Sequence, residues 1–161
     1  MAVKKAKPSL SLDTFDLAIL RILQQDATVP QRLIGESVGL SAPAVQRRIK
    51  RMQNDGVIAS QVAVLEPGYV GLPLTIVAAV ELKTESGGRI DEVKAEFLQA
   101  EEIQQCYYVT GETDFILILL VSDMAEYEAV TQRLFFGNEN IRKFKTFVAM
   151  DRTKTSTCVN I

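Results

Sequence analysis

The 161-residue chain contains no histidine and no tryptophan, and it has only two cysteines. The missing histidine excludes every catalytic triad or proton relay that needs an imidazole, and every zinc or haem site with a histidine ligand. Cys106 and Cys158 are far apart in the sequence, so the closely spaced pairs of redox and zinc-ribbon motifs are absent too. We therefore expect two structural thiols, no metal site and no catalytic site that depends on histidine.

Long hydrophobic runs are also missing. The start, MAVKKAKPSL, is basic, but no apolar core of signal-peptide length follows it. The next apolar stretch, Leu17 to Leu23, is interrupted by Arg21 and is too short to span a bilayer. We therefore expect a soluble cytoplasmic protein with no membrane partner. Its hydrophobic fraction of 47% suffices for one ordinary core or two small ones.

The net charge of -2 conceals two unlike halves. Residues 1–60 hold 9 Lys and Arg against 5 Asp and Glu, which leaves +4. Residues 61–161 hold 9 against 15, which leaves -6. Halves of opposite sign predict two domains with different partners. We assign residues 1–60 to the first domain with its N-terminal tail, 61–73 to a connector strand or hinge, and 74–161 to the second domain.

The first half predicts three short helices. Asp13 is placed to cap the first, the second runs over about residues 30–37, and Gly39 supplies a tight turn. Ser41 precedes the third helix, whose apolar stripe at helical spacing is formed by Val45, Ile49 and Met52. Three helices with a glycine turn before a basic last helix match the helix-turn-helix plan.

The second half alternates strands and helices. Residues 57–65 are β-rich and predict a strand-like connector. Beyond it, the expected order is strand, helix, strand, strand, helix, strand, with strands at 74–82, 103–110, 115–121 and 141–150. That order predicts a ferredoxin-like βαββαβ fold, an α+β arrangement with both helices on one face of an antiparallel sheet. We expect a further strand at 155–161, paired along an edge or with a partner chain.

Strand 115–121, FILILLV, is apolar at both alternating positions. Both faces of the sheet therefore need burial there, and the helices can cover only one. Contact with the same face of a second subunit is the simplest solution, so the pattern predicts a homodimer.

The basic third helix has two interpretations. Most charged helix faces are merely solvated, but this one ends a compact three-helix unit in the only half with positive charge. That combination favours binding to the phosphates and base edges of double-stranded DNA.

Four stretches of the chain resemble the Lrp/AsnC family of transcription regulators. They are LDTFDLAILRILQQDA at 12–27, VGLSAPAVQRRIKRMQNDGVI at 38–58, LEPGYVGLP at 65–73 and VTGETDFILILLVSDMAEYEAV at 109–130. The likeness covers about residues 11–155. It implies a winged helix-turn-helix domain joined to a ferredoxin-like regulatory domain. One departure is Thr28, where the family commonly has arginine.

The resemblance also implies functional residues. It places the DNA-binding positions on the third helix, with Arg48 and Arg51 assigned to phosphate contact or structural support; the others are Ser41, Pro43, Ala44, Gln46, Arg47 and Lys50. It places an amino-acid effector, leucine-like or other, against two groups: Gly111, Glu112, Thr113 and Asp114, and Val148 with Ala149. It implies a nucleoid-associated regulator that forms dimers and then tetramers or octamers.

Two other classes of protein remain open at this point. An architectural, chromatin-like protein without effector control would use the same helices and assembly. An enzyme built on the second domain would have Glu112, Asp114 and Arg142 as candidates, but no nucleophile with a base and no metal set accompany them. On its own, Gly-x-x-Asp between two strands is more often a plain hairpin turn.

Overall fold

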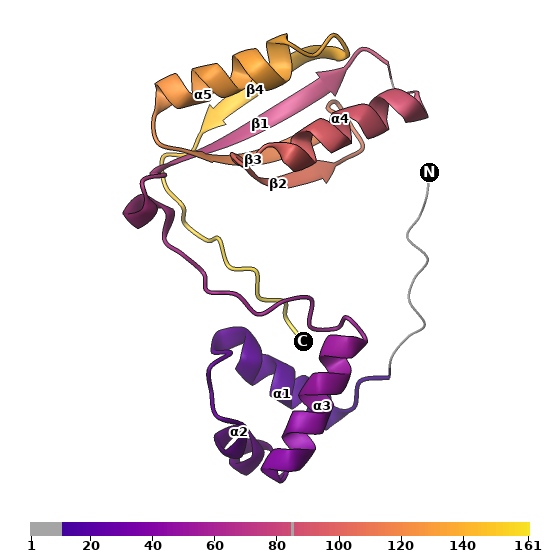
Figure 1. Ribbon diagram of the computed structural model, residues 1–161, viewed down its shortest axis with the longest axis vertical. Coiled ribbons are helices and arrows are strands. Elements are labelled where there is room, and N and C mark those ends of the chain that lie inside the picture. Colours follow the sequence, from indigo (N-terminus) through magenta and orange to yellow (C-terminus); the bar gives the residue numbers. More distant parts are fainter. Residues whose placement is uncertain (1–10, 85) are drawn as a thin grey trace. The chain divides into compact units, whose positions relative to one another are not determined.

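The computed structural model describes residues 11–84 and 86–161, and it divides the chain into two compact units (Figure 1). One unit is Val64–Lys154. The other holds the described residues 11–63 together with Thr155–Ile161, and we refer to it as the helical unit. The basic start, MAVKKAKPSL, lies outside the described residues. No described helix is both long enough and apolar enough to cross a membrane.

Three helices form the helical unit, as the sequence predicts: α1 (Thr14–Gln25), α2 (Gln31–Val38) and α3 (Ala42–Asn54). The expected cap is confirmed, since the Asp13 side chain accepts a hydrogen bond from the amide of Asp16. The predicted stripe of α3 is buried, and with α1 and α2 it forms the core from Ile19, Leu20, Ile34, Val45, Ile49 and Met52. Burial of this stripe fixes which side of α3 faces outward.

Glycines shape the turn between α2 and α3. Gly39 has a φ of 73°, the left-handed conformation that favours glycine. Gly35 is needed for a different reason, because a Cβ atom there would lie 2.4 Å from the carbonyl oxygen of Leu40. The amide of Leu40 donates to the Gly35 carbonyl at 2.9 Å, which closes α2 against the start of α3.

The connector differs from the expectation. Residues 57–66, all of them described, form no strand, and only a short 3-10 helix, η1 (Pro67–Val70), follows. A β-rich segment becomes a strand only where a neighbouring strand takes its backbone hydrogen bonds. No described strand lies beside this segment, and side chains such as Val62 and Val64 are largely exposed.

The unit Val64–Lys154 has the predicted βαββαβ order. Its elements are β1 (Leu74–Leu82), α4 (Gly87–Gln99), β2 (Ile103–Tyr108), β3 (Phe115–Val121), α5 (Met124–Thr131), a π-helical turn η2 (Gln132–Phe136) and β4 (Ile141–Val148). The sheet order is β2-β3-β1-β4, and all its pairs are antiparallel. The bounds of β1 and β3 agree with the prediction, whereas β2 and β4 each end two residues early.

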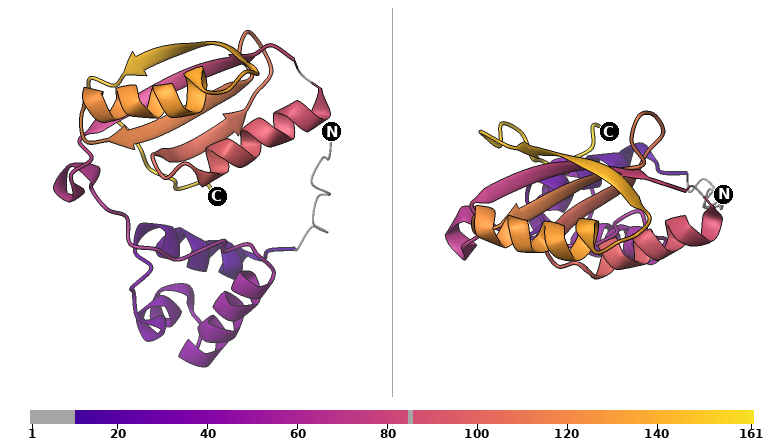
Figure 2. Two further views of the ribbon diagram at one scale, coloured as in Figure 1. Left: turned by 45° about the horizontal axis from the view of Figure 1, so that its top comes forward. Right: turned by 90° about the horizontal axis from the view of Figure 1, so that it is seen from above.

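Both helices cover the same face of the sheet (Figure 2). Alternate residues of β3 on that face are fully buried: Phe115, Leu117, Leu119 and Val121. Phe97 of α4 packs edge-on against Phe115, with ring centroids 5.3 Å apart. The core of this unit therefore lies between the helices and the sheet.

On the opposite face of the sheet, which we call the open face, no described helix of this unit packs. Ile116, Ile118 and Leu120 are only half-buried there. The strand register places Val77 between Ile118 and Phe147, and Phe147 is 56% exposed. The single chain thus presents an apolar sheet face, which is the feature from which the sequence predicts a dimer.

The segment Thr155–Ile161 is not a strand, contrary to our expectation. It packs with the helical unit rather than with the domain 74–161 to which we assigned it. Its backbone groups form hydrogen bonds with side chains of α1, whereas we expected them to pair with a neighbouring strand.

Candidate functional site

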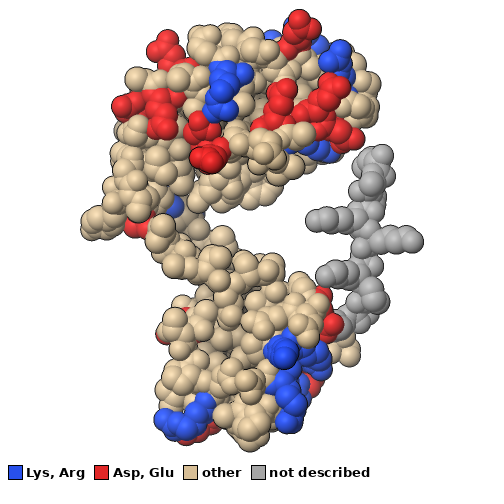
Figure 3. All heavy atoms as spheres, in the orientation of Figure 1, with Lys and Arg blue, Asp and Glu red and all other residues tan. Residues whose placement is uncertain are grey.

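The outward side of α3 carries polar and basic side chains. Gln46, Arg47 and Lys50 are exposed, as are Ser41 and Pro43 at the start of the helix, whereas Ala44 is half-buried. The side chains of Arg47 and Lys50 have no hydrogen bond or ion pair with any residue that the structure describes. Figure 3 shows the Lys and Arg side chains of the helical unit in two places, a larger group at the right of the view and a smaller one at the lower left, with Asp or Glu atoms beside each. A helix with free basic groups and a buried opposite stripe can approach an anionic partner without rearranging its core.

A groove beside α3 adds residues that the sequence analysis missed. It has a volume of about 360 Å³ and brings Gln46 and Lys50 together with Gln31, the first residue of α2. Gln53 and Asn54 line it as well. Amide side chains both donate and accept hydrogen bonds, so this groove extends the polar surface from α3 to the start of α2. No sequence motif marks Gln31.

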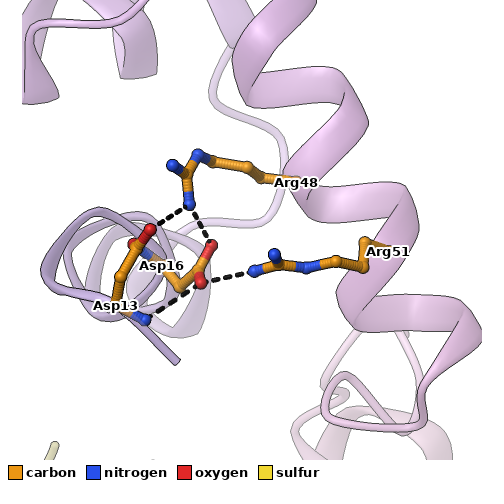
Figure 4. A network of polar contacts seen from close by, with 4 residues as sticks. All are labelled: Asp13, Asp16, Arg48 and Arg51. Carbon is orange, nitrogen blue, oxygen red and sulfur yellow. Dashed lines mark hydrogen bonds and ion pairs between the residues drawn. The ribbon is translucent and has the colours of Figure 1, made fainter. Parts of the chain in front are cut away.

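Arg48 and Arg51 lie on another flank of α3 and point toward α1 (Figure 4). Arg48 Nη1 is 2.8 Å from Asp16 Oδ1 and 2.7 Å from Asp13 Oδ2, and Arg51 pairs with the other oxygen of Asp16. The Asp16 side chain is only 1% exposed. A carboxylate this deeply buried needs such partners, and the two arginines supply them. Both arginines therefore have a structural role within the helical unit.

The same carboxylates also start α1. Asp13 and Asp16 form a reciprocal capping box, in which each side chain accepts from the backbone amide of the other, at 2.9 and 3.1 Å. The Asp16 amide and then the Arg48 guanidinium hold the pKa of Asp13 below its usual value. A lowered pKa in the folded state stabilises the fold above the unfolded-state pKa, and this stabilisation is lost as the pH falls.

Thr28 has a defined place in the turn between α1 and α2. Its amide and hydroxyl both donate to Asp26 Oδ1, at 2.8 and 2.6 Å. These bonds lower the pKa of Asp26 and close the turn locally. Thr28 thus contributes a turn contact within the helical unit.

The loop from Gly111 to Asp114 is anchored to the end of β1. Asp114 Oδ2 accepts from the Leu82 amide at 2.7 Å, and Thr113 Oγ1 donates to the Val80 carbonyl at 2.6 Å. Gly111 has a φ of 134°, which favours glycine. Glu112 is exposed at the tip, so the loop combines a fixed base with an accessible outer side.

Val148 and Ala149 lie at the other end of the sheet. Val148 is paired with Ile76, and the Ala149 amide donates to the Thr75 carbonyl at 2.9 Å. Thr75 and Leu82 stand at opposite ends of β1, roughly 20 Å apart along the strand. Within one chain, the two groups of predicted effector residues are therefore not brought together.

Thr75 is a second residue that the sequence analysis missed. Its hydroxyl oxygen is buried and has no hydrogen-bond partner among the described residues. The register opposite Leu120 places Thr75 on the open face, at the end of the sheet where Ala149 lies. A buried hydroxyl without a partner is uncommon in folded proteins.

Neither a metal centre nor a disulfide is present among the described residues. They contain no group of three or more Cys, Asp and Glu side chains that could hold a metal ion. Cys106 and Cys158 are both free, and burial raises the pKa of the Cys106 thiol. A raised thiol pKa keeps Cys106 protonated and unreactive at neutral pH.

Comparisons with known proteins match both units. The family model described as winged helix-turn-helix DNA-binding matches residues 12–59, and the model described as Lrp/AsnC ligand binding domain matches residues 75–159. An HTH-type transcriptional regulator of Sinorhizobium fredii is 40% identical over 95% of this chain and 90% of its own length. A leucine-responsive regulatory protein of Haemophilus influenzae is 30% identical over 92% and 89%. The crystal structure of an AsnC family transcriptional regulator from Agrobacterium tumefaciens has a TM-score of 0.87 at 31% identity, over 92% of this chain and 97% of that one.

Replacing Asp16 tests the buried ion pairs. Asp16→Ala removes the carboxylate and leaves Arg48 and Arg51 facing each other across the gap, so we expect the helical unit to lose about 3 kcal/mol of unfolding free energy. Denaturant unfolding followed by circular dichroism measures this loss. Glu36→Ala is the matched control, since it removes an exposed pair with Arg32 and should cost less than about 1 kcal/mol. Equal effects of the two substitutions would contradict the structural role of Asp16.

Proposed function

This chain belongs to the Lrp/AsnC family of DNA-binding transcription regulators, which are not enzymes, and from this premise we propose that it binds DNA as a homodimer under the control of an amino acid. The observation that carries the proposal is the outward side of α3, where Gln46, Arg47 and Lys50 are exposed and the two basic side chains have no partner among the described residues. Paired α3 helices about 34 Å apart would enter successive major grooves.

The residues of α3 divide into two roles in this proposal. Gln46, Arg47 and Lys50 contact base edges and phosphates, because amide and guanidinium groups match the hydrogen-bonding patterns of bases. Ser41, Pro43 and Ala44 lie at the start of the helix and approach the DNA backbone. Arg48 and Arg51 position α3 through Asp16 rather than reading DNA, since their charged groups are already paired.

The open face is the proposed dimer contact. Ile118, Leu120 and Phe147 together with Val77 form a continuous apolar surface on a sheet that no described helix covers on that side. Contact between two such faces removes apolar surface from water. Assembly into tetramers or octamers would then use other surfaces.

An amino-acid effector is the proposed ligand of the second domain. Support comes from the match to a ligand binding domain and from the leucine-responsive name of a relative. The amides near Gly111 can bind a carboxylate, and the Asp114 carboxylate can bind an ammonium group. Because Val148 and Ala149 lie at the other end of β1, a site that uses both groups requires two different subunits.

DNA binding is tested on the DNA upstream of the chain's own gene. Arg47→Ala and Lys50→Ala should each weaken binding roughly tenfold, because each removes a phosphate or base contact. Gel retardation at several salt concentrations measures both the affinity and its salt slope, which should be less steep in each variant. Arg89→Ala, which removes an exposed arginine of α4, is the control and should bind as the wild type does. Binding that is indifferent to salt and to both α3 substitutions would contradict the proposal.

The dimer contact is tested by placing a charge on the open face. Ile118→Lys should raise the dimer dissociation constant by roughly 100-fold or more, since an unpaired ammonium group would be buried in the contact. Light scattering measures the mass, and circular dichroism checks that the monomer is folded. Leu98→Lys is the matched control, because Leu98 is 76% exposed on α4. A folded Ile118→Lys variant with an unchanged mass would rule out this contact.

The effector is tested by calorimetry with the twenty amino acids. We expect heat from at least one of them, and Asp114→Asn should weaken its binding roughly tenfold by removing a charge-assisted hydrogen bond. The asparagine retains an oxygen that can accept from the Leu82 amide, so the loop should stay anchored. Asp91→Asn on the exposed side of α4 is the control. No heat with any amino acid, or unchanged binding by Asp114→Asn, would contradict the proposed site.

A further inference from the structure

The segment Thr155–Ile161 is held by one side of α1. The Gln24 side chain forms two hydrogen bonds with the backbone of Val159: Oε1 accepts from the amide at 2.7 Å, and Nε2 donates to the carbonyl at 3.2 Å. Arg21 Nε donates to the carbonyl of Ile161 at 2.6 Å. The Cys158 thiol donates to the backbone carbonyl of Gln24 at 3.2 Å. Three residues of this segment, Cys158, Val159 and Ile161, are thus hydrogen-bonded to α1.

The chemistry of these contacts resembles strand pairing. A glutamine amide offers one donor and one acceptor side by side, which is what a neighbouring strand offers to a backbone. Arg21 and Gln24 are three residues apart on α1 and therefore lie on the same side of the helix. The contact also has an apolar part, since Ile161 packs against the helical core cluster. Gln24 and Arg21 thus bind backbone groups of the segment Thr155–Ile161.

The path leading to this segment is short and fixed. The Ala149 amide is bonded to Thr75 at the end of the sheet, and Arg152 pairs with Glu66 at 2.9 Å. Only five residues, 150–154, separate Ala149 from the segment, and five extended residues span at most about 18 Å. The chain therefore crosses between its two units twice, once at residues 63–64 and again at residues 154–155.

We propose that Thr155–Ile161 is a clip that ties α1 of the DNA-binding unit to the end of β4. A change in the position of Val148 or Ala149 then reaches α1 through residues 150–154, in addition to the irregular connector 57–66. Two connections between the units restrict the motion of the helical unit more than a single linker does, because each connection limits the conformations that the other can adopt. The formation of the clip is independent of the proposed function, whereas its effect on DNA binding rests on it.

The amide of Val159 reports directly on the clip. In the full-length wild type we expect this amide to exchange with solvent roughly tenfold more slowly than an unstructured amide, because it donates to Gln24 Oε1. Gln24→Ala should abolish that protection, whereas Gln25→Ala, an exposed neighbour on α1, should leave it unchanged. NMR hydrogen exchange at two protein concentrations measures this. An unprotected wild-type amide would overturn the clip, and protection that disappears on dilution would overturn its formation within one chain.

A DNA measurement tests the effect of the clip on binding. Arg21→Ala combined with Gln24→Ala should weaken binding to DNA with two half-sites about threefold to tenfold and leave binding to a single half-site unchanged. The reason is that release of the clip loosens the paired units without altering α3. Equal affinity of the variant and wild type for two half-sites would overturn the restraint. If the wild type bound neither DNA, the proposed function would fail, while the Val159 amide would still decide whether the clip forms.

Discussion

The buried carboxylate of Asp16 is the constraint on which the DNA-binding side of the molecule depends. Its side chain is 1% exposed and lies between Arg48 and Arg51 of α3. A charge in that position is stable only while both arginines face it, so the carboxylate fixes the rotation of α3 about its own axis as well as its distance from α1. The apolar stripe alone would allow some rotation, because methyl and methylene contacts are not directional. Burial of the stripe thus sets the outward side of α3, and the ion pairs narrow the rotation at which Gln46, Arg47 and Lys50 face outward.

The second unit depends on a different constraint, which is the alternation of β3. Its even and odd positions are both apolar, so helices on one side leave Ile116, Ile118 and Leu120 without cover. An exposed apolar surface of this kind promotes non-specific association. A specific contact with a second subunit would bury the surface and so prevent this. The apolar character that stabilises the βαββαβ core on one side therefore favours assembly on the other. In the proposed dimer, folding and assembly of this unit would both depend on the seven residues of β3.

Local patterns in the sequence predict the elements well, because helical and strand periodicities depend on near neighbours. The stripe of α3 and the bounds of β1 and β3 follow from such patterns. Contacts between distant residues do not: Asp16 and Arg48 are 32 positions apart, and nothing in either neighbourhood marks the pair. The segment 155–161 shows the same limit. Its residues suit a strand, but its backbone is hydrogen-bonded to the side chain of Gln24, which lies 135 positions away from Val159.

In the proposed site, the placement of the predicted effector residues would link ligand binding to assembly. Asp114 is anchored at the Leu82 end of β1, and Ala149 at the Thr75 end. A small amino acid cannot span a distance of roughly 20 Å, so a ligand that touches both groups must lie between subunits. By linkage, such a ligand favours whichever assembly forms its site, and the assembly raises the affinity for the ligand by the same factor. A shift of Ala149 on ligand binding would then be transmitted through the clip to α1, because only five residues join Ala149 to Thr155. Ligand, assembly and DNA binding would in this way share one short path along the chain.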